Sequence, residues 1–393
     1  MALIQTISVL KSLYKIGVNN KNTVLAGSNY PNFAIPIFNF VPDTMINEQN
    51  SRTELSELGE FGLIHHLTQG IKLVNPETLM GVGDDAAVIM AGEKLTLFST
   101  DLLVEGVHFD LAYYPLKHLG YKAAVVNFSD IAAMNGSPKQ ITVGMAVSNR
   151  FPLEALEEIY SGILTACAKY KVDLVGGDTT SSNKGLFLSI SVLGETSQEE
   201  VTYRGTASEG DLICVTGDLG GAYAGLLLLE REKQVFKVDP QMQPELDGYD
   251  YVLERQLKPE ARTEFREIFR IAGIKPTSMI DISDGLASEI LHICIDSGVG
   301  CALYEDKIPV DMVTEQVVKE FNIDPSIAAL NGGEDYELLF TVKQQDYEKV
   351  NALAGVSVIG HITHSSGGVN LISISGTSIA LNAQGWDAFL RKE

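Results

Sequence analysis

From Leu79 onward, the chain alternates short apolar segments of strand length with longer segments that carry the apolar spacing of helices. The predicted strands are Leu95–Phe98, Ile141–Val147, Val172–Val175, Leu186–Leu193, Leu212–Val215, Met279–Ile282 and Leu338–Val342. The predicted helices are Leu116–Met134 and Pro152–Tyr170, with two more beginning at Gly217–Gly221 and Ser283–Gly285. Alternating strands and helices pack in layers, because each element must bury an apolar face against another. The sequence therefore predicts a mixed α/β fold.

A polar stretch, residues 195–210, interrupts this pattern near its middle. With 393 residues the chain has room for two domains, each with its own core. We expect an N-terminal α/β domain over residues 54–200 and a C-terminal α/β domain over residues 205–393. Residues 1–50 are rich in Asn and lack the pattern, and Met45 lies just before the organised part. We interpret them as a poorly ordered extension or a misassigned start, with an accessory segment as the alternative.

The charge of the chain limits its partners. The formal net charge is −22 at pH 7. Such a surface repels nucleic acid and anionic membranes, so neither is an expected partner. It also repels an anionic nucleotide unless divalent cations intervene, which points toward metal-bridged substrates. A surface that is acidic only for solubility is the alternative interpretation.

The cysteines and the hydropathy favour a cytoplasmic protein. Cys167, Cys214, Cys294 and Cys301 form no Cys-x-x-Cys pair, and each lies in an apolar context. They are typical of small buried residues in a reducing compartment, not of a disulfide framework or a zinc site. No apolar run approaches the ~20 residues that span a bilayer, and the N-terminus has no clear signal peptide.

Aspartates occur at the ends of apolar segments or inside them. They are Asp84, Asp85, Asp101, Asp130, Asp178, Asp281 and Asp284. Asp101 ends a predicted strand, Asp178 follows Gly176-Gly177 at another strand end, and Asp130 interrupts a predicted apolar helix. A lone carboxylate in an apolar site has to be paired, protonated or bound to a metal.

Basic partners are scarce around these aspartates, since the near neighbours are Lys122, Lys184 and Lys275, each at least five residues away. A hard cation is the remaining partner. Mg²⁺ takes oxygen ligands and is typically held by a few carboxylates together with substrate phosphates. Hydroxyl groups suited to such a shell adjoin the aspartates, at Ser99, Thr100, Ser129, Thr179 and Ser283.

Each aspartate also has a purely structural interpretation. An Asp after Gly-Gly commonly forms a turn, and Ser283-Asp284 could cap a helix. Asp130 has neither explanation, because it lies mid-helix in an apolar run. The recurrence of the setting favours a functional metal cluster.

The Gly-Lys phosphate loop and the kinase His-Arg-Asp loop are absent from the sequence, and Gly217–Gly221 is only a weak candidate for a phosphate cradle.

Taken in order, these segments resemble the thiamine-monophosphate kinase family over residues 54–390. The matching motifs are Gly59-Glu60-Phe61, Gly83-Asp84-Asp85-Ala86-Ala87, Ser99-Thr100-Asp101, Val107-His108-Phe109, Asn127-Phe128-Ser129-Asp130-Ile131-Ala132-Ala133-Met134, Gly176-Gly177-Asp178-Thr179-Thr180, Arg204-Gly205, Asp281-Ile282-Ser283-Asp284-Gly285 and Gly332-Gly333-Glu334-Asp335-Tyr336-Glu337. Related proteins share single motifs, but the ordered set is specific.

The resemblance implies a two-domain PurM-like fold, the fold of aminoimidazole ribonucleotide synthetase. The N-terminal domain would pair its sheet with that of a second subunit, giving a homodimer, and the C-terminal domain would lie over it. The implied reaction is direct transfer of the ATP γ-phosphoryl group to thiamine monophosphate, with several Mg²⁺ ions, in thiamine diphosphate biosynthesis. The resemblance implies no general base, because the acceptor is an ionised phosphate.

The resemblance also implies roles for individual residues. The magnesium ligands would be Asp84, Ser99, Thr100, Asp101, Asp130, Asp178, Asp281 and Asp284, of which Asp101, Asp130 and Asp284 are the catalytic set. The ATP site would contain Gly177, Asp178, Arg204 and Ser283, with Tyr170 near the adenine. The thiamine phosphate would contact His108, Glu334 and Trp386. Trp386 matches the family pattern loosely, and a buried apolar anchor is its alternative role.

Two other functions stay open at this point. One is another ATP-dependent enzyme of the superfamily, such as aminoimidazole ribonucleotide synthetase, which activates an amide oxygen. The other is a non-catalytic nucleotide- or thiamine-binding dimer, which predicts missing ligand aspartates. Selenophosphate synthetase and hydrogenase maturation are disfavoured, because the chain has no cysteine near its N-terminus and does not end in one.

Overall fold

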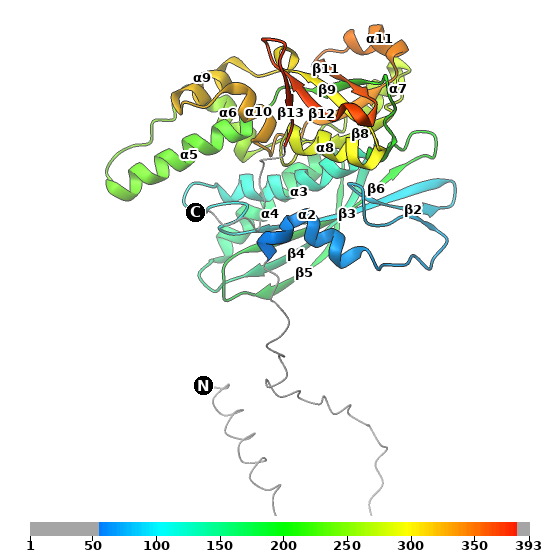
Figure 1. The fold of residues 1–393 in the computed structure, drawn as a ribbon. Helices are drawn as coiled ribbons and strands as arrows, with labels where there is room; N and C mark the ends of the chain where they lie inside the picture. Colours follow the sequence, from blue (N-terminus) through cyan, green and yellow to red (C-terminus); the bar gives the residue numbers. More distant parts are fainter. Residues whose placement is uncertain (1–54, 383–393) are drawn as a thin grey trace, which may run out of the picture. The chain divides into compact units, whose positions relative to one another are not determined.

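The computed structural model describes residues 55–382, and side chains from Phe61 onward. The expectations for residues 1–50 and for Trp386 therefore lie outside the described residues. Within this part, two β-sheets are each covered by helices, which confirms the predicted α/β fold (Figure 1). No helix in the described range is long and apolar enough to cross a membrane.

The first sheet has six strands in the order β1-β2-β3-β6-β4-β5. Its strands are β1 (Thr78–Met80), β2 (Ala87–Ala91), β3 (Lys94–Val104), β4 (Ser137–Val147), β5 (Asp173–Ser181) and β6 (Phe187–Thr196). Neighbouring strands pair antiparallel, except that β4 and β5 are parallel. The parallel pair needs a crossover, which α4 (Leu153–Tyr170) supplies.

The second sheet has seven strands in the order β13-β12-β9-β11-β7-β10-β8. Its strands are β7 (Leu212–Thr216), β8 (Ser278–Asp281), β9 (Gly300–Tyr304), β10 (Leu338–Val342), β11 (Val356–Thr363), β12 (Val369–Ile372) and β13 (Ser378–Ala380). The longer helices of this half are α5 (Gly221–Val238), α6 (Asp250–Leu257), α7 (Phe265–Ala272), α8 (Leu286–Ser297) and α9 (Met312–Glu320). Shorter ones are α10 (Pro325–Asn331) and α11 (Tyr347–Asn351), while α2 (Leu55–Thr68) precedes the first sheet.

Helix α3 (Leu116–Ala133) is buried around most of its surface, because it lies between the two sheets (Figure 1). Its residues Val125 and Phe128 belong to the core of the first sheet, with α4 alongside. At its C-terminal end, Ala132 and Ala133 pack with residues of β8, β10 and α7. A helix that is apolar all round is typical of such a position. Any polar side chain on α3 is therefore held inside the molecule.

The helices agree with the sequence prediction more closely than two of the strands do. Helix α3 and helix α4 follow the predicted ranges to within one residue at each end. The predictions that Asp101 and Asp178 end strands are wrong, because β3 continues to Val104 and β5 to Ser181. Pairing with β6 and β4 respectively extends both strands past their apolar residues.

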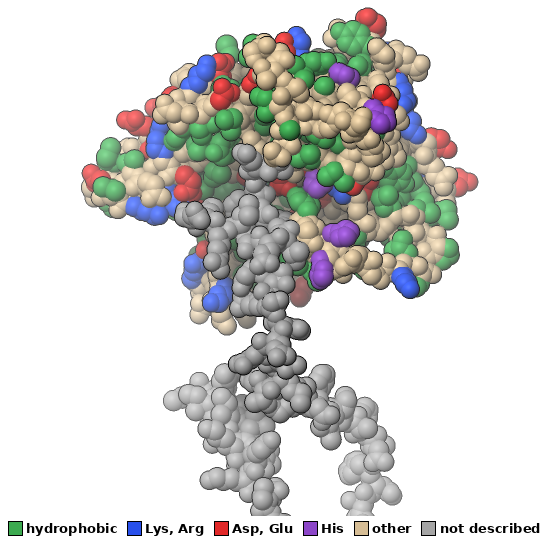
Figure 2. All heavy atoms as spheres, in the orientation of Figure 1, with side chains coloured by type: hydrophobic (Ala, Val, Ile, Leu, Met, Phe, Trp, Pro, Cys, Tyr) green, Lys and Arg blue, Asp and Glu red, His purple; other side chains and the backbone are tan. Residues whose placement is uncertain are grey.

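The surface carries both signs of charge despite the acidic composition. On the visible face, acidic and basic side chains are scattered rather than gathered in one basic patch (Figure 2). Four cysteines, Cys167, Cys214, Cys294 and Cys301, are buried and carry free thiols, as predicted.

Candidate active site

The pleat of β3 decides which of its polar residues turn toward α3. Side chains alternate between the two faces of a strand, so Ser99 and Asp101 share a face with the buried Leu97 and Leu103. The Ser99 hydroxyl donates to Oδ2 of Asp130 on α3 at 2.5 Å. Thr100 lies on the opposite face, and its hydroxyl donates to the Ile190 carbonyl at 3.1 Å.

Strand β8 brings a third aspartate to the same helix. Asp281, the last residue of β8, is buried and accepts a hydrogen bond from the Ser129 hydroxyl at 2.5 Å. Ser129 and Asp130 are consecutive residues of α3, so the helix makes a side-chain hydrogen bond to each sheet. The predicted residues Ser99, Asp130 and Asp281 are thus brought together.

Asp84 and Asp85 approach this group from the loop before β2. Asp84 accepts hydrogen bonds from its neighbour's amide at 3.0 Å and from the Arg204 amide at 3.1 Å. Oδ2 of Asp85 is inaccessible to solvent and has no hydrogen-bond partner among the residues that the structure describes. We refer to Asp85, Asp101, Asp130 and Asp281 together as the aspartate group.

Burial and mutual repulsion raise the pKa values of the aspartate group. Burial, followed by the charge of Asp281, raises the pKa of Asp101 to about 7. The pKa of Asp130 rises well above its ordinary value, through burial and then the charges of Asp101 and Asp281. Burial raises the pKa of Asp281 to about 6. The protein therefore holds several carboxylates whose ionisation requires a compensating positive charge.

A magnesium ion fits the oxygen chemistry of this group. Among the residues that the structure describes, no three His, Cys, Asp or Glu side chains form a group that could hold a metal ion as they stand. Mg²⁺ commonly takes only one or two carboxylates, with water and substrate phosphates completing its shell. The unpartnered oxygen of Asp85 is a donor of the right kind.

Other predicted residues lie around the group. Arg204 donates to the Gly83 carbonyl and to Asp296, each at 2.7 Å, and so connects the Gly83 loop to α8. The amide of Asp284 donates to Oε1 of Glu289 at 2.7 Å, just before α8. Ser283 donates to the same oxygen through its amide at 3.1 Å.

The parallel strand β5 holds two predicted residues away from the buried aspartates. Asp178 is exposed on this edge strand and does not join the aspartate group. A Cβ at Gly177 would lie 2.0 Å from the Val143 carbonyl, so glycine there is required by the pairing of β5 with β4. Tyr170, at the end of α4, donates its hydroxyl to Glu260 at 2.6 Å.

His108 and Glu334 lie close enough for the charge of Glu334 to act on the imidazole of His108. Nδ1 of His108 accepts a hydrogen bond from the Val104 amide at 3.0 Å. Burial lowers the pKa of His108, the charge of Glu334 raises it and the charge of Lys122 lowers it. Glu334 forms an ion pair with Lys122, with Nζ and Oε1 2.7 Å apart.

Sequence reasoning missed several residues of the site. Glu289 is buried in α8, and burial raises its pKa to about 8. Lys122 is buried in α3, and Asp85 is one of the candidate aspartates to which the sequence assigns no individual role. Lys122 and Glu289 show the same sequence feature that singled out Asp130, namely a charged residue inside an apolar helical run.

A second buried acidic group contrasts with the first. Asp335 and Glu337 are almost fully buried, in the loop before β10. Nη1 of Arg255 lies 2.7 Å from Oε1 of Glu337, and Nη2 lies 3.3 Å from Oδ1 of Asp335. Arg262 donates to both oxygens of Glu337. We refer to these four residues as the arginine-paired group.

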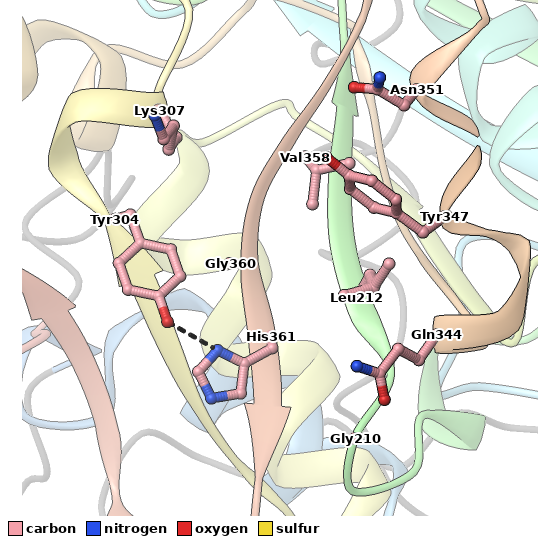
Figure 3. A pocket seen from close by; sticks show the side chains of 10 residues that line it. All are labelled: Gly210, Leu212, Tyr304, Lys307, Gln344, Tyr347, Asn351, Val358, Gly360 and His361. Carbon is pink, nitrogen blue, oxygen red and sulfur yellow. Dashed lines mark hydrogen bonds between the residues drawn. The ribbon is translucent and has the colours of Figure 1, made fainter. Parts of the chain in front are cut away.

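A separate cavity lies elsewhere, on the second sheet. It has a volume of about 620 Å³. Its lining consists of Gly210, Leu212, Tyr304, Lys307, Gln344, Tyr347, Asn351, Val358, Gly360 and His361. Tyr304 and His361 are hydrogen-bonded on one side, and Tyr347 and Gln344 face them from the other (Figure 3). None of the predicted site residues that fall within residues 61–382 lines this cavity.

Comparison with known proteins first identifies the class of protein to which this chain belongs. Residues 83–196 match the family model described as AIR synthase related protein, N-terminal domain, and residues 208–371 match the corresponding C-terminal domain. Hydrogenase maturation protein HypE in complex with ATP has the same fold, with a TM-score of 0.60 at 18% identity. It covers 84% of this chain and 98% of its own, and at this identity the likeness concerns the fold alone.

The curated relatives define the family within this class. Thiamine-monophosphate kinase of Bacillus subtilis is 32% identical over 341 residues, covering 84% of this chain and 100% of its own. The enzyme of Synechococcus elongatus is 35% identical, and the match covers 80% of this chain and 91% of that enzyme. A solved structure described as AaThiL complexed with AMPPCP and TMP has a TM-score of 0.72 at 30% identity, covering 86% and 99%. The chain belongs to the thiamine-monophosphate kinase family.

Proposed function

We propose that this protein transfers the γ-phosphoryl group of ATP to the phosphate of thiamine monophosphate, giving thiamine diphosphate and ADP. Family membership supports the substrates, since a related structure is described as a complex with AMPPCP and TMP. The observation that carries the chemistry is the aspartate group, gathered around α3 from both sheets. A non-catalytic binding protein has no need of repelling carboxylates at such a place.

Phosphoryl transfer depends on positioning and on neutralising charge more than on covalent chemistry. Bound Mg²⁺ would neutralise the phosphate oxygens of the two anionic substrates. The residues proposed to hold it are Asp84, Ser99, Asp101, Asp130, Asp281 and Asp284. Thr100 and Asp178 remain predictions, because their side chains lie on another face or another edge of the sheet. We assign no general base, since an ionised phosphate oxygen is the acceptor.

The substrates are proposed to bind next to this acidic site. Gly177, Asp178, Arg204, Ser283 and Tyr170 are assigned to ATP, as the resemblance implies. His108 and Glu334 are assigned to thiamine monophosphate. Hydrogen bonding to the Val104 amide leaves the Nε2 of neutral His108 with the proton, so this nitrogen is a donor for an anionic substrate. The proposed contact from Trp386 lies outside the described residues.

We also propose a cytoplasmic homodimer. The face of the first sheet opposite α3 exposes large apolar side chains, among them Phe98 and Leu102 of β3 and Leu193 of β6. Large apolar side chains exposed on one face of a sheet are typical of an interaction surface, which supports sheet pairing between two subunits. The buried free thiols are typical of a reducing compartment, which supports the cytoplasm.

The decisive experiment is chromatography of the full chain incubated with ATP, Mg²⁺ and thiamine monophosphate, with an EDTA control. Equal amounts of thiamine diphosphate and ADP, formed only with the metal, are expected. Folded protein that binds Mg·ATP but forms no diphosphate would contradict the proposal. Formylglycinamidine ribonucleotide would then be tested as the acceptor, because the matched family models bear the name of AIR synthase.

A further inference from the structure

Lys122 is a charged residue in the interior of α3. It is 1% exposed, and an ammonium group is costly to bury unless it is paired. Its Nζ lies 2.7 Å from Oε1 of Glu334, 3.4 Å from the Gln256 carbonyl and 5.7 Å from the centre of the Tyr114 ring. The burial of this charge therefore depends chiefly on one carboxylate from the other half of the molecule.

Glu334 is held at both its side chain and its backbone. Lys122 donates to Oε1, and Nε2 of Gln256 donates to Oε2 at 2.9 Å. The backbone of Glu334 has φ +58°, a left-handed conformation that is uncommon outside glycine. Its amide donates to the Ser283 carbonyl at 2.6 Å. Backbone conformations of this kind persist where the surrounding structure enforces them, often at functional sites.

The ion pair has an inner and an outer side. The side chain of Lys122 is 2% exposed and that of Glu334 is 29% exposed. Lys122 thus contacts the Glu334 carboxylate on its buried side, and the exposed part of the carboxylate remains open to a ligand. An ionised carboxylate has about four acceptor positions, so hydrogen bonds from Lys122 and Gln256 leave some of them available.

We propose that Lys122 is a positioning residue for the acceptor substrate, acting through Glu334. It holds the Glu334 side chain in one orientation, so that the open part of the carboxylate accepts hydrogen bonds from an amine-bearing, cationic heteroaromatic ligand. This inference rests on the proposed function, because thiamine monophosphate has that chemistry. Lys122 itself does not contact the substrate in this arrangement.

The test is calorimetric titration of thiamine monophosphate into the full chain with Mg²⁺ and a non-hydrolysable ATP analogue, comparing wild type with Lys122→Met. Methionine keeps the apolar stem and removes the charge. The Kd for thiamine monophosphate should rise about 10-fold or more, because the variant loses one charge-assisted hydrogen bond that orients Glu334. The Kd for the nucleotide analogue should change less than about 2-fold.

Action through Glu334 is tested by a double-mutant cycle. In a Glu334→Gln background, Lys122→Met should weaken thiamine monophosphate binding by less than about 2-fold further. The matched control is Arg266→Met, which breaks an ion pair to Glu200 of 2.6 Å and a hydrogen bond to Ser137 of β4. That variant should leave both Kd values unchanged. Independent, multiplying effects of Lys122→Met and Glu334→Gln would overturn the inference, as would equal losses for both ligands.

A second variant keeps the inference testable when Lys122→Met does not fold. Gln256→Met leaves the lysine in place and removes the other donor to Glu334. It should raise the Kd for thiamine monophosphate about 3-fold, again without changing nucleotide binding. Unchanged affinity would overturn the inference. Wild-type protein that binds thiamine monophosphate without phosphorylating it would contradict the proposed function, while the variants would still test Lys122.

Discussion

The molecule buries two groups of carboxylates in opposite ways. In the arginine-paired group, two guanidinium groups contact Glu337 and one also contacts Asp335. In the aspartate group, Asp130 and Asp281 accept hydrogen bonds from neutral serine hydroxyls, and the charges of the group repel one another. In the first arrangement each carboxylate has a guanidinium partner within the protein. In the second, burial and mutual repulsion outweigh the charge of Arg204 near Asp85, which supports the proposal that a cation and phosphates bind there.

The largest effect should come from Asp130→Asn. The variant removes one negative charge from the proposed metal site. Turnover should fall by about a thousandfold, because the transition state loses several kcal/mol of charge stabilisation. Stability should not fall, because repulsion with Asp101 and Asp281 is relieved. Steady-state kinetics and thermal unfolding measure the two effects. Asp173→Asn, at an exposed position of β5, is the control. Unchanged turnover in Asp130→Asn would remove the basis for the metal assignment.

The opposite pattern is expected for Arg255→Met in the arginine-paired group. Removing one partner of a buried ion pair leaves an uncompensated charge and costs about 3–5 kcal/mol. Urea unfolding should show this loss as a lower midpoint. Arg270→Met breaks an exposed pair with Glu267 and should leave the midpoint nearly unchanged. A buried variant as stable as the wild type would show that the arginines are dispensable for folding.

Asp335 provides a pH test within the arginine-paired group. Burial outweighs the charge of Arg255 and raises the pKa of Asp335 from 3.8 to about 6. Its protonated form therefore contributes stability that is fully present below about pH 4 and is lost as the pH rises through about 6. Relative to Asp335→Asn, the wild type should lose about 2 kcal/mol of unfolding free energy between pH 4 and pH 7. Urea titrations across this range would contradict the assignment if the two proteins changed in parallel.

The smallest effect is expected for Thr216→Val. The Thr216 hydroxyl donates to Oε2 of Glu337 at 2.6 Å and accepts from the Leu338 amide at 2.9 Å. Its loss leaves buried groups without a partner and should cost about 1–2 kcal/mol of stability. Turnover of the folded variant should stay within about 2-fold of wild type. A large fall in turnover at unchanged stability would show that the arginine-paired group takes part in catalysis.

Periodicity predicted much of the architecture, but it misjudged strand ends. The apolar helices α3 and α4 were recognised to within a residue, because their pattern reports burial directly. In β3 and β5 the apolar signal stops before the strand does. The remaining residues pair by backbone hydrogen bonds, to which side-chain polarity contributes little. Asp101 and Asp178 were consequently placed at strand ends.

The sequence by itself determined which carboxylates would be difficult to bury, since Asp130 interrupts an apolar helix whatever surrounds it. Only the tertiary structure decided which of them would be neutralised. Arg255 reaches Asp335 and Glu337 across about 80 residues of chain, whereas the described contacts of Asp130 include a serine hydroxyl and other acids. Partner choice depends on distances between elements remote in sequence. Local pattern carries no information about those distances.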